Sequence, residues 1–204
     1  MRPRRTVRGF TLIELLVVLA VIVVISAAAA PAIGSLTGAN ARQAAGQVSG
    51  AMRHLFDTAA MRHQTCRLVL DLDGRAWWAE CAPGAVGLSR REDPAEEEED
   101  LETRFPDEKD ADLRRILAKT RFGAFEDRLV SKRELPGNAG FGRIRLEGRR
   151  DAIEEGKAYV HFFPGGRAQR AYVPIADGDH LYTVVLEPMT GRARVVSGPV
   201  EVRE

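Results

Sequence analysis

"RGFTLIELLVVLAVIVVI", the stretch from Arg8 to Ile25, combines a long apolar run with a single carboxylate, Glu14, near its start. The run continues to Ala30, and residues Phe10–Ala30 as a helix would span roughly 31 Å, about the hydrocarbon thickness of a bilayer. An ionised side chain inside a membrane is costly and usually has a function and a partner. The stretch therefore predicts a membrane helix whose glutamate is used.

The residues before this run carry charge of one sign. Residues 1–9 contain four arginines and no acidic residue, which favours retention of the N-terminus in the cytoplasm and export of the chain beyond the apolar run. One interpretation is a secretory signal peptide, cut in the small-residue stretch Ala27–Ala30 to release a periplasmic protein. The length of the run and the presence of Glu14 favour a segment that stays on the protein.

A second helix is predicted after the apolar run. Pro31 comes directly after the run and is expected to kink the helix, and residues 34–40 are rich in Gly, Ser, Thr and Asn. Apolar residues then recur at helical spacing over Ala39–Arg62. We expect residues 31–62 to form an amphipathic helical segment that continues the membrane helix, with Ala39–Arg62 docked on a folded domain.

The sequence changes to a strand pattern after His63. In "TCRLVLDLDGRAWWAEC", Thr65 to Cys81, two apolar runs flank Asp73-Gly74, which indicates a β-hairpin. A two-residue turn pairs Leu72 with Arg75, and the same register places Cys66 opposite Cys81. Their Cα atoms would then lie about 5 Å apart, within the range of a disulfide.

Further strands are predicted between turn signals in the C-terminal half. They are Gly142–Glu147, Ala158–Phe163, Ala171–Ile175, His180–Glu187 and Arg192–Val196. The fold class is therefore α+β: a long N-terminal helix, first apolar and then amphipathic, packed on an antiparallel β-domain over residues 63–204.

An acidic insertion interrupts this β-domain at about residues 87–140. It holds 12 acidic residues between Glu92 and Asp112, and like charges at this density resist compaction. A solvated surface loop is the favoured interpretation. A calcium loop is the alternative, but the run lacks the alternating acid and glycine pattern of an EF-hand, so no metal is predicted.

Composition points away from catalysis and from broad nucleic-acid binding. The net charge is +1, with −8 over residues 10–112 and +5 over residues 113–204. The sequence has no GxSxG, HExxH or P-loop pattern, so no catalytic residue and no cofactor are predicted. His54, His63, His161 and His180 occur singly, which favours structural or surface roles.

The hexapeptide "GFTLIE", Gly9 to Glu14, resembles the signature of type IV prepilins. The resemblance implies that a prepilin peptidase cuts between Gly9 and Phe10, removing residues 1–9 as a leader, and methylates the new N-terminal Phe10. It also implies that Glu14 pairs with the N-terminal amine of a neighbouring subunit during filament assembly. Pro31 lies where many members of the family have a helix-kinking proline.

Within this family the layout resembles the H-type minor pseudopilins of type II secretion and their minor-pilin relative FimT. The resembling stretches are "ARQAAGQVSGAMRH", "RLVLDLDGRAW", "VHFFPGGRA" and "YTVVLEPMTGRARVV". The resemblance implies a pilin-like fold in which the helix packs on a sandwich-like pair of β-sheets. It also implies a structural subunit, anchored once in the bacterial inner membrane with a periplasmic C-terminal domain, that joins a pseudopilus for protein export.

The partners implied are the prepilin peptidase, the other major and minor pseudopilins, the inner-membrane secretion platform and membrane lipid. A FimT-like minor pilin that serves pilus assembly or DNA uptake remains the alternative, although the charge distribution makes nucleic acid the less favoured partner.

Overall fold

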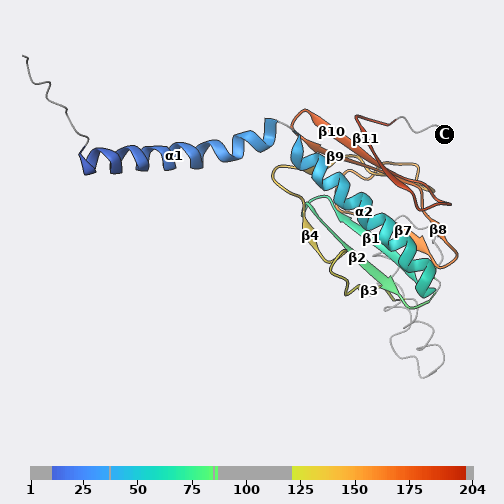
Figure 1. The fold of residues 1–204 in the computed structure, drawn as a ribbon. Coiled ribbons are helices and arrows are strands. Elements are labelled where there is room, and N and C mark those ends of the chain that lie inside the picture. The colour runs from blue at the N-terminus through green and yellow to red at the C-terminus, as the bar shows by residue number, and fades with distance from the viewer. Residues whose placement is uncertain (1–10, 37, 85, 87–120, 201–204) are drawn as a thin grey trace, which may run out of the picture.

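A computed structural model describes residues 11–36, 38–84, 86 and 121–200 of the chain, with the backbone alone for residues 26–36. Two helices come first, α1 (Leu12–Leu36) and α2 (Ala39–Arg62). Figure 1 shows α1 extending away from the rest of the molecule, whereas α2 lies along the β-domain. No helix in these described ranges combines the length and the apolar character needed to span a membrane.

The junction between the helices lies at Gly38. Residue Gly38 adopts the left-handed conformation with φ +60°, and the His180 ring packs so closely that an added Cβ would lie 2.5 Å from its Cγ. Only glycine fits both requirements. The α1 backbone runs through Pro31 as helix and ends at Leu36, and α2 begins at Ala39, so the helix is not broken at the proline. The predicted kink at Pro31 remains a prediction.

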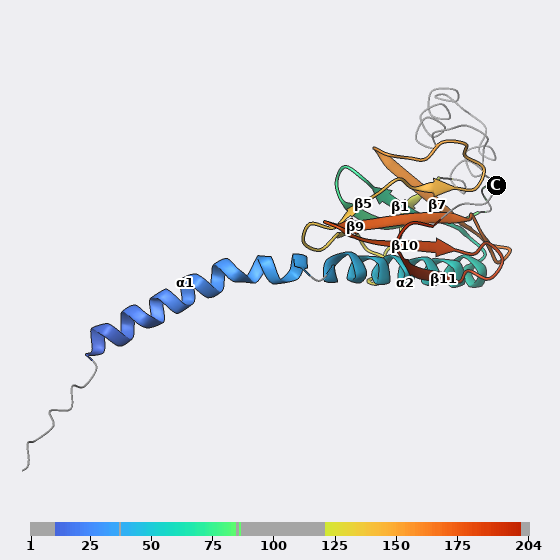
Figure 2. The same ribbon diagram turned by 90° about the horizontal axis from the view of Figure 1, so that it is seen from above.

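Helix α2 packs on the β-domain through a stripe rich in small residues. It contacts β10 (His180–Leu186) and β11 (Ala193–Ser197), and Figure 2 shows β10 above the helix and β11 overlapping it. Alanines dominate the stripe, which lets the strands approach the helix closely. The buried members are Ala41, Ala44, Ala45, Val48, Ala51, Met52, Leu55, Thr58 and Ala59.

The strands form two antiparallel sheets. Sheet A contains β1 (Thr65–Asp71), β2 (Ala76–Ala82), β3 (Gly123–Ala124), β4 (Arg133–Glu134), β7 (Lys157–Phe163) and β8 (Arg167–Ala168). Sheet B contains β5 (Gly140–Phe141), β6 (Arg145–Leu146), β9 (Ala171–Asp177), β10 (His180–Leu186) and β11 (Ala193–Ser197).

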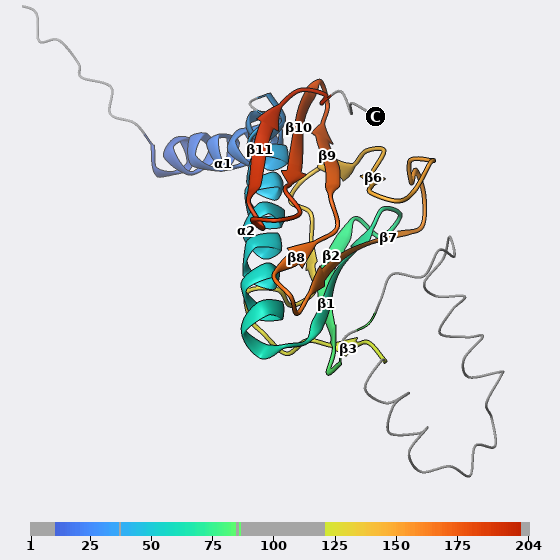
Figure 3. The same cartoon turned by 90° about the vertical axis from the view of Figure 1, so that its right-hand side faces the viewer.

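The two sheets meet over α2. Strand order is β3-β2-β1-β7-β8 in sheet A, with β4 also on β2, and β11-β10-β9-β5 in sheet B, with β6 also on β9. Figure 3 shows both sheets lying along the same side of α2. The core between them includes Trp77, Phe162, Met52, Leu55 and Leu68, all fully buried. This arrangement confirms the α+β, sandwich-like class predicted from the sequence.

The first hairpin has the predicted register but a wider turn. Asp71 pairs with Ala76, and the turn comprises the four residues Leu72–Arg75, so the predicted two-residue turn is wrong. The Asp71 carboxylate accepts a hydrogen bond from the Gly74 N–H (2.8 Å), and Leu72 N–H donates to the Gly156 carbonyl (2.9 Å). Because of these bonds the turn residues do not pair with each other as strand residues, but the pairing register of β1 and β2 is the predicted one.

Other strand predictions differ in extent. Only Arg145–Leu146 of the predicted strand Gly142–Glu147 is strand, because Gly142 N–H donates instead to the Pro174 carbonyl and Ile144 pairs with Ile153. Residues 121–140 of the predicted insertion contribute β3, β4 and β5 to the sheets. Two-residue strands carry too little alternation to be seen in a sequence. The acidic run Glu92–Asp112 lies outside the described residues.

Candidate functional site

Glu14 lies in the first turn of α1, with its side chain exposed. Its backbone N–H donates to the Thr11 carbonyl oxygen (3.1 Å) and lies 3.4 Å from Thr11 Oγ1, so Thr11 caps the helix start. A carboxylate in the first turn is favoured by the partial positive charge of the helix N-terminus. Gly9 and Phe10, the predicted processing residues, lie outside the described part of the chain.

Apart from Glu14, the described side chains of α1 form an apolar surface all round the helix. The large ones between Leu12 and Ile25 are 50–80% exposed. A helix that is hydrophobic on every face is stable only inside lipid or against other protein. This segment therefore requires an apolar environment that the isolated chain does not provide.

The face of α2 opposite its packed stripe carries two glycines one turn apart. Gly46 and Gly50 are exposed, and an added Cβ at either would meet no atom within 4 Å. Glycine in a helix interior costs roughly 0.5–1 kcal/mol relative to alanine. The fold of the single chain therefore gives no reason for glycine at these two positions.

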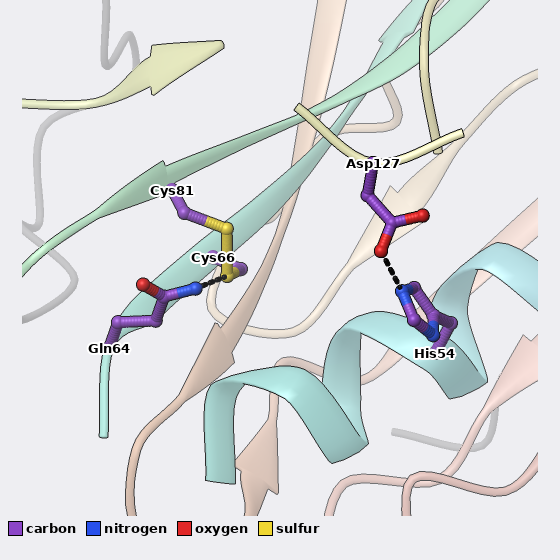
Figure 4. Close-up of a disulfide and its surroundings, with 5 residues drawn as sticks. All are labelled: His54, Gln64, Cys66, Cys81 and Asp127. Atoms are coloured by element: carbon purple, nitrogen blue, oxygen red, sulfur yellow. Dashed lines mark hydrogen bonds and ion pairs between the residues drawn. A yellow bond between two sulfur atoms is a disulfide. The ribbon is translucent and has the colours of Figure 1, made fainter. Parts of the chain in front are cut away.

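The residues predicted to form a disulfide are bonded in the structure. Cys66 on β1 and Cys81 on β2 are directly paired, and their Cα atoms are 4.1 Å apart. Figure 4 shows the bridge beside Gln64, whose amide Nε2 lies 3.5 Å from Cys66 Sγ. On the other side of the same view His54 Nε2 lies 3.0 Å from Asp127 Oδ2, which ties α2 to the segment after β3.

Removal of the bridge should lower the free energy of unfolding. Because the two cysteines are 15 residues apart in sequence, the loss for Cys66→Ala/Cys81→Ala should be roughly 3 kcal/mol in the chain-entropy model. Urea unfolding measures the change, and the parent protein under reducing agent serves as the matched control. Equal stability of the parent and the double variant without reductant would contradict a bonded pair that stabilises the fold.

The face of sheet A that points away from α2 contains a buried ion pair. Arg67 on β1 donates through Nε and Nη2 to Glu80 Oε2 on β2 at 2.7 and 2.6 Å. The guanidinium lies between the rings of Phe122 and Tyr159, 4.1 and 4.6 Å from their centroids. The register that pairs the cysteines also pairs Arg67 with Glu80, so this contact could have been found from the sequence.

His161 lies beside this ion pair and is buried. Its pKa is lowered from 6.5 to about 4, chiefly through desolvation by burial and also through the nearby Arg67 charge, while the contact with Gln169 opposes the shift. The imidazole packs edge-on to Phe122 and stacked with Phe163. His161 is therefore neutral in the folded protein at neutral pH.

Acid should destabilise the domain through His161. Between pH 6.5 and about 4 the unfolded chain binds a proton that the folded chain does not, so stability is lost as the pH falls through this window. The full effect is about 3 kcal/mol. We expect the stability advantage of the parent over His161→Gln to shrink by about that amount between pH 7 and pH 4 in urea titrations. Parallel pH profiles for the two proteins would show that this group does not titrate in this window.

The histidines do not form a common site. His54 pairs with Asp127, His161 is buried in sheet A, and His180 packs on Gly38. Within the described ranges no group of three or more His, Cys, Asp or Glu side chains is placed to hold a metal ion.

One basic groove was not predicted. It has a volume of about 580 Å³ on sheet B and is lined by Arg170, Glu187, Pro188, Met189, Thr190, Arg192 and Arg194. Three arginines and one carboxylate line the groove, so its charge is positive. Arg170 Nη2 lies 4.0 Å from the Glu187 Oε2 atom of that carboxylate. The signal in the sequence is Arg192 and Arg194 at alternate positions of the predicted strand Arg192–Val196, which places both side chains on one face.

Comparison with known proteins agrees with both the N-terminal motif and the fold. A family profile, the prokaryotic N-terminal methylation motif, matches residues 4–30. The chain therefore combines an N-terminal motif of this kind with a fold in which a helix packs on an antiparallel β-domain.

The particular likeness is to a minor pseudopilin. A crystal structure of the minor pseudopilin EpsH from the type II secretion system of Vibrio cholerae superposes with a TM-score of 0.51 and 14% identity, covering 80% of this chain and 99% of that one. A second EpsH structure matches at a TM-score of 0.45 and 10% identity, covering 78% and 95%. A search by sequence among curated proteins finds no match.

Proposed function

We propose that this chain is a minor pseudopilin, a structural subunit of a type II secretion pseudopilus that helps to export folded proteins across the outer membrane. The observation that carries the proposal is the combination of a prepilin-type motif at residues 4–30 with a domain that shares the fold of EpsH. The chain has no catalytic role in this proposal; it acts through its contacts with other subunits.

The proposed life cycle begins in the inner membrane. The run Phe10–Ala30, which extends beyond the described side chains at both ends, holds the chain in the bilayer, and the arginines of residues 1–9 keep the leader in the cytoplasm. Prepilin peptidase removes the leader after Gly9 and methylates Phe10. The domain that carries the Cys66–Cys81 bridge then faces the periplasm, where disulfides form and persist.

Assembly transfers the apolar helix from lipid to protein. In the proposed filament α1 packs against the helices of neighbouring subunits, which covers the exposed side chains between Leu12 and Ile25. The Glu14 carboxylate, at the N-terminal end of α1, neutralises the Phe10 amine of a neighbour. A buried carboxylate and a buried ammonium are each costly alone and offset much of that cost as a pair.

The glycines of α2 support close packing of helices in this assembly. Without a side chain at Gly46 and Gly50, the backbone of a second helix can approach α2 along this face. The single chain is less stable because of them, and the proposed gain appears only when a neighbour is bound.

Replacing these glycines by alanine should make the single chain more stable but weaken its assembly with partner subunits. Gly46→Ala/Gly50→Ala should raise the free energy of unfolding of the isolated chain by roughly 1–2 kcal/mol, because alanine favours the helix and meets no neighbouring atom. The same variant should cross-link less to partner pseudopilins. Ser131→Ala/Lys132→Ala, two exposed residues outside the helix, is the control. Increased stability together with unchanged cross-linking would refute a contact at this face.

Site-specific photo-cross-linking in secreting cells tests the proposed function. A photoreactive residue at Gln43, exposed on α2 beside the glycines, should cross-link to other pseudopilins, whereas one at the exposed Arg149 should not. The Gln43 products should disappear in cells that lack prepilin peptidase, and deletion of this chain should reduce secretion of folded exoproteins. Unchanged secretion and no pseudopilin among the Gln43 products would contradict the proposal.

A FimT-like role in DNA uptake is the second candidate, favoured by the three arginines of the groove on sheet B. Binding through phosphate contacts weakens steeply as salt rises. A gel shift that falls with salt and is lost in Arg192→Ala/Arg194→Ala would support it. If cells secrete exoproteins efficiently and the protein causes no gel shift with DNA, the DNA-uptake role is refuted and the pseudopilin role remains.

A further inference from the structure

Strand β11 is an edge of sheet B and pairs only with β10 among the described strands. Glu187 N–H donates to the Arg192 carbonyl (3.0 Å) and Gly198 N–H to the Leu181 carbonyl (2.8 Å). The direction of the backbone N–H and C=O groups alternates along an antiparallel strand. In β11 these groups therefore point toward β10 at even-numbered residues and away from the sheet at odd-numbered residues.

Part of this outward edge is already covered and part is open. The Ala193 carbonyl accepts a hydrogen bond from Ser49 Oγ of α2 at 3.0 Å. Val195 and Ser197 lie beyond that contact and are exposed. Their N–H and C=O groups have no partner among the described residues, so four backbone groups form a short open edge of the kind to which another strand can be added.

The side chains beside this edge specify what can be added. Arg192, directly before β11, and Arg194 within it lie on one face of the extended chain, about 6.8 Å apart, which is the spacing of alternate residues in any added strand. Both are exposed, and together with Arg170 they outnumber the one carboxylate of the groove, Glu187. Acidic side chains at alternate positions of an added strand would therefore lie against arginines.

We propose that the β11 edge binds an extended acidic segment of a partner polypeptide by strand addition. The partner's backbone bonds to Val195 and Ser197, and its carboxylates meet Arg192 and Arg194. The open backbone edge favours a polypeptide over a nucleic acid, which offers no backbone donors in this spacing.

The inference is independent of the secretion system that the chain serves, and it is tested on the full chain in detergent micelles. The probe is a fluorescein-labelled peptide of the sequence Thr-Glu-Val-Glu-Val-Glu-Thr. Fluorescence anisotropy should rise to saturation, and hydrogen exchange should slow in the segment that contains β11. Arg192→Glu/Arg194→Glu should weaken binding at least about tenfold, because it places like charges together. Arg149→Glu/Arg150→Glu, an exposed pair of the same charge change, should leave binding unchanged.

The backbone contribution is tested by a change that keeps the charges. Val195 N–H points away from β10, so Val195→Pro retains the β10–β11 ladder, and proline is tolerated at such edge positions. This variant should unfold like the parent but lose the peptide. A peptide with proline in place of both valines should also fail to bind.

Three results would overturn the inference. The first is no saturable binding of the acidic peptide. The second is equal binding by the Val195→Pro variant or by the prolyl peptide, which would reduce the interaction to charge alone. The third is tighter binding of a short DNA duplex that Val195→Pro does not affect, which would assign the arginines to nucleic acid.

Discussion

Gly9→Leu should leave the leader on the protein in all molecules. The expected cut lies between Gly9 and Phe10, and a peptidase site that accepts glycine has no room for a branched four-carbon side chain. The retained leader would keep four arginines and a blocked Phe10 at the start of the apolar run. Without a free Phe10 amine the partner of Glu14 is missing, so assembly and secretion should fail as well.

Intact-mass measurement of the membrane fraction reads the result directly. The parent should lose residues 1–9 and gain a methyl group, and the variant should do neither. N-terminal sequencing of the parent separates this processing from ordinary signal cleavage, because the first residue is Phe10 in one case and a residue near Pro31 in the other. Normal trimming of Gly9→Leu, or a parent that begins near Pro31, would refute cleavage at Gly9.

Glu14→Val should be processed like the parent but fail to assemble. Cleavage depends on Gly9 and its immediate flanks, and Glu14 lies more than a helical turn beyond the cut, in the first turn of α1. Valine removes the only charge of the run, so membrane insertion should be at least as good as in the parent. In a filament, however, the neighbour's Phe10 ammonium would be buried without a partner, which is strongly destabilising.

Cross-linking to partner pseudopilins should therefore be lost, and secretion should fall to the level of a strain that lacks this chain. Glu14→Asp is the matched control, since it keeps the carboxylate and should retain part of the activity. If the chain caps the filament, Glu14 has fewer neighbours and the defect should be milder than for a shaft subunit. Full cross-linking and full secretion by Glu14→Val would remove the assembly role of this carboxylate.

The sequence alone determined the features that depend on local pattern. The spacing of apolar residues predicted α2 over Ala39–Arg62, the range that the structure shows. The alternation around Asp73-Gly74 predicted the β1–β2 register, and with it the pairing of Cys66 and Cys81. Each of these features follows from the spacing of apolar side chains along one segment of the chain. No information about segments distant in the sequence is needed to predict it.

The tertiary structure decided where distant segments meet. It placed the helix break at Gly38, because the ring of His180, the first residue of β10, lies against that residue. It widened the first turn through a bond from Leu72 to Gly156, and it brought Arg170 and Glu187 beside Arg192 and Arg194. It also left the edge of β11 open beyond Ser49. These contacts join residues far apart in the chain, and no local period specifies them, so they arise only when α2 and the two sheets pack together.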